Sequence, residues 1–166
     1  MRVAKAKVIL AACAMLLVFG GRASAQYPDQ IGAGMSFTER DGTATGVTVD
    51  YAHPIVPFIK GPLAVLGEFG LNSAEGTTLT SYLGGVRFRW DLTRRVAPFG
   101  QFLAGAEHCC GATNVALQPG FGVEIAVMAW MSVRAQVDFR DVWLEGDDVG
   151  GKRYTFGVAL PFRGRR

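Results

Sequence analysis

The feature that most constrains the fold is a strict alternation of apolar and polar side chains, which runs without interruption through SVRAQVDFRD at 132–141. The apolar parity contains Val133, Ala135, Val137 and Phe139, and the polar parity contains Arg134, Gln136, Asp138 and Arg140. Successive side chains of a β-strand point to opposite faces, so this segment is predicted to form a strand with one apolar and one charged face. The fold then depends on which of the two faces points inward.

The same period of two recurs in eight segments of strand length, and no stretch has the period of a convincing amphipathic helix. The predicted strands cover residues 31–38, 46–52, 62–71, 79–90, 97–106, 115–127, 132–141 and 153–162. The segments between them, including 53–61 with its two prolines and 107–114, are predicted to be connectors. Consecutive strands with short connectors predict an all-β, eight-stranded antiparallel up-and-down barrel that forms a single domain.

Residues 1–25 have the pattern of a secretory signal peptide. A basic start, MRVAKAK, precedes the apolar run VILAACAMLLVFG, and ASA at 23–25 matches a cleavage site that leaves 26–166 as the barrel domain. The apolar run is too short and wrongly flanked for a membrane-spanning helix. LAAC at 10–13 looks like a lipoprotein signal, but most of the apolar sequence follows Cys13, which argues against acylation.

Removing this leader changes the charge of the chain. Four of the 17 basic residues lie in it, so residues 26–166 carry 13 basic and 14 acidic side chains. Apart from the RGRR tail at 163–166, no polybasic segment remains, and nucleic acid is not an expected partner.

Three features indicate which face points inward. The polar face is rich in glycine and alanine, which make room for long charged side chains in the narrow interior of an eight-stranded barrel. An arginine on a lipid-facing wall costs about 2–4 kcal/mol at the midplane, so four strand arginines would cost about 8–16 kcal/mol there, comparable to the stability of a whole domain. Aromatic residues of the apolar face are predicted to gather at the two rims, as in bilayer girdles. These are Phe37, Phe69, Tyr82, Trp143 and Tyr154 at one rim, and Tyr51, Phe58, Trp90, Trp130 and Phe162 at the other.

The inward-facing charges are therefore expected to pair with one another. The predicted interior network consists of Asp50, Glu68, Arg87, Arg89, Glu124, Arg134, Asp138 and Arg140. A tight turn at MAWM (128–131) would place Glu124 opposite or diagonal to Arg134 as a cross-strand ion pair. Buried charges are tolerated when they are paired and hydrogen-bonded, so the network predicts a transmembrane barrel with a polar, plugged interior.

With these features, the chain resembles the eight-stranded outer-membrane β-barrel family of the OmpA, OmpX and opacity-protein type. The resemblance rests on the leader, the alternating strands, the YLGGVRF segment followed by a short turn and APFGQ, and the closing YTFGVALPF. That last segment is similar to the final strand recognised by the outer-membrane assembly machinery, with Phe162 in the terminal aromatic position, although four residues follow it here. The resemblance implies a periplasmic start, extracellular loops at the Gly- and Asp-rich connectors, and residence in the outer membrane of a Gram-negative-type bacterium.

Two adjacent cysteines, Cys109 and Cys110, remain after the leader, within EHCC at 107–110. Neighbouring cysteines cannot staple a long loop, so the chain is not a disulfide scaffold, and the pair is a candidate vicinal disulfide. His108 and two thiolates are soft-metal ligands, but they lack the spacing of ordinary zinc sites, so neither a metal nor a cofactor is predicted.

Catalysis is not expected either. Some small outer-membrane barrels are lipid acyltransferases or proteases, which need a nucleophile, a base and an orienting group near the outer rim. The two histidines, His53 and His108, are predicted at opposite ends, and Ser73 and Ser81 have no identifiable His/Asp partners. No catalytic residue is assigned, and a general porin would need many more strands.

The sequence therefore predicts a small, monomeric, non-enzymatic outer-membrane protein with a structural or surface-interaction role. Its expected partners are outer-membrane lipid and, during biogenesis, the assembly machinery; no surface ligand is identified. The residues expected to face outward in the loops are Glu39, Asp41, Glu75 and Asp147. Two alternatives stay open: an outer-membrane enzyme acting on lipid, with His108 as its best candidate, and a soluble periplasmic lipocalin-like barrel that binds an apolar ligand with its faces reversed.

Overall fold

The structure is a computed structural model that describes residues 27–39, 42–58, 60–74, 77–143 and 148–162. The predicted signal peptide at 1–25, the loop residues Asp41, Glu75 and Asp147, and the basic tail at 163–166 lie outside the described residues.

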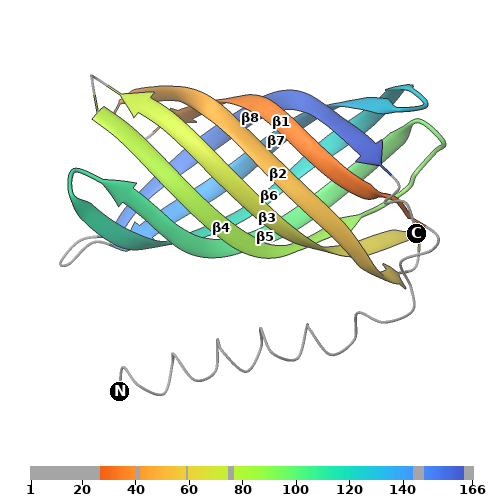
Figure 1. Cartoon of the computed structure of the whole chain (residues 1–166), viewed down its shortest axis with the longest axis horizontal. Coiled ribbons are helices and arrows are strands. Elements are labelled where there is room, and N and C mark those ends of the chain that lie inside the picture. The colour runs from red at the N-terminus through yellow and green to blue at the C-terminus, as the bar shows by residue number, and fades with distance from the viewer. Residues whose placement is uncertain (1–26, 40–41, 59, 75–76, 144–147, 163–166) are drawn as a thin grey trace, which may run out of the picture.

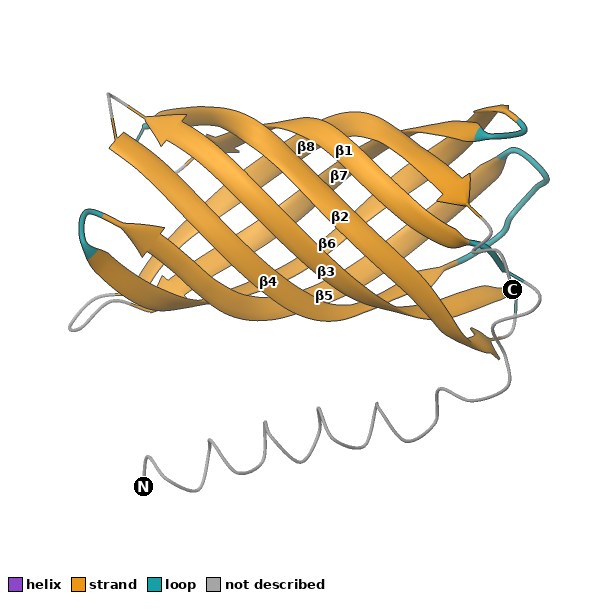
Figure 2. Cartoon of the chain, in the orientation of Figure 1, coloured by secondary structure: helices purple, strands orange, loops and turns teal. Residues whose placement is uncertain are grey.

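Eight strands form one closed barrel, in which each strand pairs with its neighbours in sequence and β1 closes the circle against β8 (Figure 1). Every pair is antiparallel. The strands are β1 (Asp29–Glu39), β2 (Thr43–Phe58), β3 (Gly61–Ala74), β4 (Thr77–Arg89), β5 (Val96–Cys109), β6 (Ala112–Met128), β7 (Met131–Trp143) and β8 (Asp148–Phe162). Figure 2 shows strands joined by short loops. No helix in the described part of the chain is long and apolar enough to cross a membrane.

The two ends of the barrel carry different connections. The end at which β1 begins and β8 ends, called the terminal end here, also carries the β2–β3, β4–β5 and β6–β7 connections. The opposite end, called the turn end, carries the β1–β2, β3–β4, β5–β6 and β7–β8 connections. In Figure 1 the terminal end lies on the right and the turn end on the left.

Two predicted connectors are wrong, because the strands continue through them. Strand β2 runs to Phe58 across both prolines of the 53–61 segment, with an irregularity in its pairing between Pro54 and Val56. Strand β5 runs to Cys109, so Glu107 is a strand residue and not a loop residue. A proline without an N–H is tolerated where a bulge interrupts the ladder, and period-two counting does not foresee such bulges.

The outer wall of the barrel is apolar. Its exposed large side chains include Ile31, Met35, Val47, Val49, Leu71, Phe102, Phe121, Val133, Phe139, Phe156 and Leu160. A soluble lipocalin-like barrel has the reverse arrangement, with its apolar side chains inside, so the alternative with reversed faces is wrong. The aromatic residues are not confined to the rims as predicted, because Phe102, Phe121 and Phe156 lie near the middle of their strands.

The interior is filled by polar side chains and a small apolar group. The buried apolar residues that contact one another are Ala52, Ala64, Leu66, Leu83, Leu103, Ala116 and Val142. Glycines on the inward face leave space for the charges: a Cβ atom on Gly120 would collide with the carboxylate of Asp138, and one on Gly32 would lie 2.6 Å from Arg134 Nη1. In this narrow interior, Gly32 and Gly120 therefore leave the space that the neighbouring charged side chains occupy.

Candidate functional site

The charged barrel interior is the candidate site. Seven of the eight predicted network residues are buried there, namely Asp50, Glu68, Arg87, Glu124, Arg134, Asp138 and Arg140. The eighth, Arg89, differs: about a third of its side chain (34%) is exposed at the terminal end, where Arg89 Nε lies 2.9 Å from Asp91 Oδ1. The buried residues form two groups, one toward each end.

The terminal-end cluster consists of Asp50, Arg87, Glu124 and Arg134. The β6–β7 ladder places Glu124 directly opposite Arg134, and Arg134 Nη2 lies 2.8 Å from Glu124 Oε1. Arg134 Nη1 also contacts Asp50 Oδ2 at 2.5 Å, and Arg87 Nη1 lies 3.1 Å from Asp50 Oδ1. Each carboxylate is thus in contact with a guanidinium group, which is the condition for keeping charges in a buried interior.

A buried aromatic ring, that of Phe99, lies beside the two arginines of this cluster. The guanidinium carbon of Arg87 lies 4.8 Å from the centre of the Phe99 ring, and that of Arg134 lies 5.5 Å from it. Both distances are within the range of cation–π attraction, which is stronger where water is excluded. Phe99 points inward with the charges, so it is the one large aromatic side chain that the described interior uses to hold cations.

The turn-end cluster consists of Glu68, Glu107, Asp138, Arg140 and Arg153. Arg153 Nη2 lies 2.7 Å from Glu68 Oε1 and 2.8 Å from Asp138 Oδ2. Arg140 Nη1 contacts Glu107 Oε2 at 2.8 Å, and Arg140 Nη2 lies 3.8 Å from Glu68 Oε1. Arg153 and Asp138 have no exposed surface (0% each), so no space of the size of a water molecule remains beside them.

Buried amides connect and complete the two clusters. Gln101 accepts hydrogen bonds from Arg87 and donates one from Nε2 to Asp138 Oδ1 at 3.0 Å, so it bridges the clusters. Gln118 accepts from Arg140 Nε at 2.8 Å and donates to Glu68. Gln30 donates to Glu124 Oε2 at 3.0 Å and accepts from Arg134. The interior is therefore a continuous hydrogen-bonded network, which side-chain alternation alone did not predict.

Sequence reasoning missed two charged members, Glu107 and Arg153. Glu107 lies in the part of β5 that was predicted to be a loop, and Arg153 stands at the first residue of the last predicted strand, where its face was not assigned. The signal was present in both cases, because Glu107 has the parity of Gln101 and Arg153 has the parity of Gly157. Extending the alternation past the predicted strand ends would have found both.

One pair of like charges faces each other across the ladder. Asp50 lies directly opposite Glu68 in the β2–β3 pairing, an arrangement that is destabilising when the two side chains approach each other. Here Asp50 contacts Arg87 and Arg134, whereas Glu68 contacts Arg153. The boundary between the two clusters therefore runs between these two neighbouring carboxylates.

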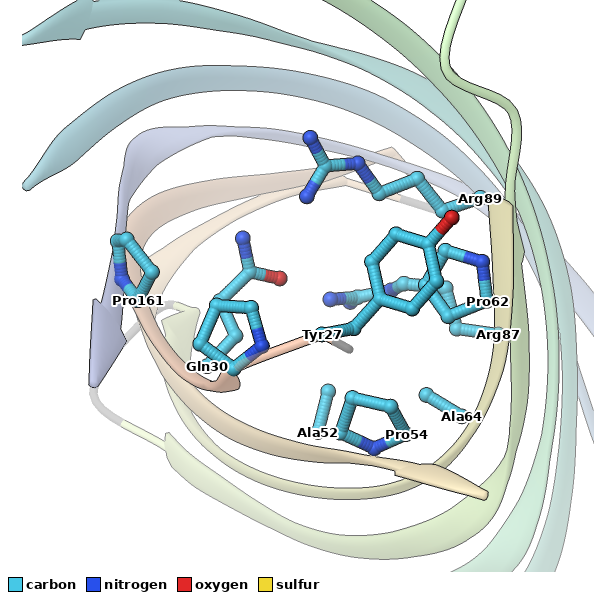
Figure 3. Close-up of a pocket in the computed structure, with 10 residues that line it drawn as sticks. Tyr27, Gln30, Ala52, Pro54, Pro62, Ala64, Arg87, Arg89 and Pro161 are labelled. Carbon is cyan, nitrogen blue, oxygen red and sulfur yellow. The ribbon is translucent and has the colours of Figure 1, made fainter. Parts of the chain in front are cut away.

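Each end of the barrel has a cavity. A small one at the terminal end, of about 40 Å³, is lined by Tyr27, Gln30, Arg87 and Arg89 with several prolines (Figure 3). In this view Arg89 reaches across the opening from the strand wall. A larger one at the turn end, of about 410 Å³ and called the vestibule here, is lined by Thr38, Thr43, Asn72, Glu107, Cys109 and Arg140, among others. The Glu107–Arg140 pair lies between the vestibule and the deeper network.

The remaining candidate residues lie at the two ends. His108 Nδ1 is 3.0 Å from Thr113 Oγ1 at the turn end, and His53 Nδ1 is 2.7 Å from Asp29 Oδ1 at the terminal end. The Sγ atoms of Cys109 and Cys110 lie 2.6 Å apart, and no disulfide bond joins them in this structure. Among the described residues, no group of three or more His, Cys, Asp or Glu side chains is arranged to hold a metal ion.

Comparison with solved structures identifies the fold. Neisserial surface protein A matches over 82% of this chain and 97% of its own, with a TM-score of 0.61 and 15% sequence identity. The chain has the fold of the small eight-stranded outer-membrane β-barrels. The attachment invasion locus protein of Yersinia pestis, Ail, matches over 81% of this chain and 97% of its own, with a TM-score of 0.55 and 17% identity.

The N-terminal β-barrel domain of Pseudomonas aeruginosa OprF is similar as well. It matches over 82% of this chain and its whole length, 100%, with a TM-score of 0.55 and 11% identity. No protein-family model matches the sequence, and no curated protein matches it either. The likeness is therefore one of fold.

Proposed function

We propose that the protein is an integral outer-membrane protein with a structural role, in which the charged interior closes and stabilises the barrel and no reaction is catalysed. The barrel adds a rigid, non-conducting element to the outer membrane and contacts outer-membrane lipid through its apolar wall. It works as a monomer, because its eight strands already close on themselves and leave no sheet edge for a second copy.

The observation that carries this proposal is the inverted distribution of side chains. In the described part of the chain, five carboxylates and four arginines are buried inside, while the exposed large side chains of the strands are apolar. In water, such a wall would be an apolar patch far larger than soluble monomers expose. In a bilayer the apolar wall contacts the apolar acyl chains of the lipid. The charged side chains lie inside the barrel and avoid the cost of facing lipid.

The tight packing of the interior supports a closed barrel and not a channel that conducts ions. Water-filled porins have 16 or more strands, whereas an eight-stranded barrel is only wide enough for its own side chains. Gln118, Asp138 and Arg153 are fully buried and lie on the path between the two end cavities. A diffusion channel would require these residues to border water.

Orientation and biogenesis follow from the same proposal. The turn end faces outward and the terminal end faces the periplasm, after a signal peptide directs export and the assembly machinery recognises β8. The β5–β6 connection is a turn of two residues, so this hairpin offers a surface partner little area. This favours a structural role over an adhesive one.

The lipid-modifying alternative lacks an assembled catalytic group in the described chain. His108, its best candidate, contacts Thr113, and the second histidine lies at the other end beside Asp29. A catalytic triad needs a nucleophile and a base within hydrogen-bond reach of each other. Replacing His108 with alanine should therefore leave both the fold and the lipid composition of the membrane unchanged.

Three measurements test the proposed function together. Cell fractionation should place the protein in the outer membrane, and the purified protein should migrate faster in detergent gels before boiling than after it. In planar bilayers the folded protein should give no steady conductance. A protein released by osmotic shock would refute the membrane location, and regular ion currents would refute the closed interior.

A further inference from the structure

The second region with unusual chemistry is the β5–β6 turn, which lies at the turn end of the barrel. The ladder pairs Cys109 with Ala112, so Cys110 and Gly111 form a turn of two residues. Both cysteines line the vestibule; Cys109 is half-buried and Cys110 is exposed. The two sulfur atoms are only 2.6 Å apart.

The backbone of this turn is unusual for a cysteine. Cys110 has a φ of 56° and Gly111 has a φ of 80°, the pattern of a type I′ turn. Asn, Asp and Gly are the residues that favour the first position of such a turn, because a positive φ is unfavourable for other side chains. Cysteine brings no advantage to the backbone here. Sparsely populated backbone conformations cluster at functional sites, so the thiol itself is the feature that needs an explanation.

We propose that Cys109 and Cys110 form a reversible dithiol–disulfide site at the rim of the vestibule, which undergoes exchange with small disulfide compounds outside the barrel. The exposed Cys110 provides the entry point, and Cys109 is the resolving thiol. The chemistry depends on the turn and not on the proposed role of the barrel, so either can fail without the other.

The exchange is balanced in two steps. The Cys110 thiolate attacks one sulfur of a small disulfide, forming a mixed disulfide with Cys110 and releasing one small thiol. The Cys109 thiolate then attacks the Cys110 sulfur, forming the Cys109–Cys110 bond and releasing the second small thiol. The protein loses two electrons and two protons, which the small disulfide takes up as it becomes two thiols. Dithiothreitol reverses the reaction by the same route.

The arrangement favours closure within one molecule. The resolving sulfur is already beside the attacked sulfur, so the second step needs no encounter with another chain. The closed form joins Cys109, the last residue of β5, to Cys110, the first residue of the turn, at the edge of the vestibule that Glu107 and Arg140 also line. Oxidation therefore alters the rim of this cavity.

Thiol counting on the exported protein, folded in detergent and without the predicted leader that contains Cys13, tests the proposal. Samples are equilibrated in buffers with increasing ratios of oxidised to reduced glutathione, quenched with acid, alkylated with N-ethylmaleimide and weighed by intact-mass spectrometry. We expect a transition from two maleimide adducts to none, with a loss of two hydrogen atoms, at a glutathione ratio that does not change with protein concentration. Dithiothreitol should restore both adducts.

Cys110→Asn is the matched control, because asparagine suits the same turn position and removes one thiol. It should fold, as judged by heat-modifiable migration, and retain one alkylatable thiol or carry one glutathione without forming an internal bond. The proposal is overturned if the folded wild-type protein keeps two alkylatable thiols at every glutathione ratio. It is also overturned if oxidation yields disulfide-linked dimers or stable glutathione adducts in place of the internal bond.

Discussion

The terminal-end cluster contains two carboxylates and two buried guanidinium groups, whereas the turn-end cluster contains three carboxylates and two guanidinium groups. The positive and negative charges of the terminal-end cluster are equal in number. Arg89 lies next to this cluster, with its Nη1 atom 3.7 Å from Glu124. The turn-end cluster has one more carboxylate than guanidinium groups, so its three carboxylates share two arginines. Unpaired buried charge is costly. The loss of an arginine and the loss of a carboxylate should therefore affect stability differently at the two ends of the barrel.

The loss of an arginine should be most damaging at the turn end. Arg153→Ala removes the contacts of both Glu68 and Asp138 and leaves three carboxylates with Arg140 alone. Breaking a buried pair costs about 3–5 kcal/mol, and we expect Arg153→Ala to lie at or above that range in the free energy of unfolding. Urea titration of the barrel in lipid vesicles, followed by tryptophan fluorescence, measures it.

Arg134→Ala provides the comparison at the terminal end. It removes contacts with Asp50 and Glu124, but Arg87 and Arg89 remain near these carboxylates. We expect it to be destabilising by about 3 kcal/mol, at the lower end of the range for a broken buried pair. Unchanged unfolding of Arg134→Ala would contradict the network, and a larger loss than in Arg153→Ala would contradict the charge comparison.

Neutralising a carboxylate should be more destabilising at the terminal end than at the turn end, the reverse of the order expected for the arginines. Asp50→Asn removes the carboxylate that Arg87 contacts and one of the two that Arg134 contacts, and we expect a loss of about 2–3 kcal/mol, as for hydrogen bonds to charged groups. Glu107→Gln keeps an acceptor oxygen for Arg140 and lowers the negative excess, so its loss should stay below about 1 kcal/mol. The same urea titration compares the two variants, and equal losses would show that the clusters do not differ in charge balance.

Filling the space beside the charges should have an intermediate effect. Gly32→Ala brings a Cβ atom within 2.6 Å of Arg134 Nη1 and close to the Asp50 carboxylate, and overpacking of this kind costs about 1–3 kcal/mol. Gly67→Ala is the matched control, because a Cβ atom there meets nothing within 4 Å. We expect the control to unfold like the wild type, and equal effects of the two changes would mean that the interior is not tightly packed.

The smallest effect on stability is expected from replacing the buried aromatic ring. Phe99→Leu keeps an apolar side chain but removes the π-face beside Arg87 and Arg134, with an expected loss of about 1–2 kcal/mol, the range for a desolvated cation–π contact. Phe102→Leu on the exposed outer wall is the control. The difference between the two should become smaller when Phe99→Leu is combined with Arg87→Met, because the ring then stabilises Arg134 alone.

Alternation was sufficient to predict the strand number, the barrel and the inward placement of charge, because a strand has only two faces and lipid excludes arginine from one of them. It failed where the pattern was interrupted. The prolines of β2 concealed a bulge, and the end of β5 was mistaken for a loop, which hid Glu107. The aromatic residues were expected at the rims, but three phenylalanines lie at mid-strand, where lipid accepts them equally well.

By itself, the sequence determined that the chain alternates, that it closes into a barrel and which residues share a face. Only the tertiary structure decided which of these residues are partners. Asp50 and Glu68 are direct neighbours in the ladder, yet Asp50 pairs with arginines of β4 and β7, and Glu68 pairs with Arg153 of β8. The physical reason is that parity fixes the direction of a side chain, whereas contacts across the barrel depend on the stagger of all eight strands, which emerges only when the sheet closes.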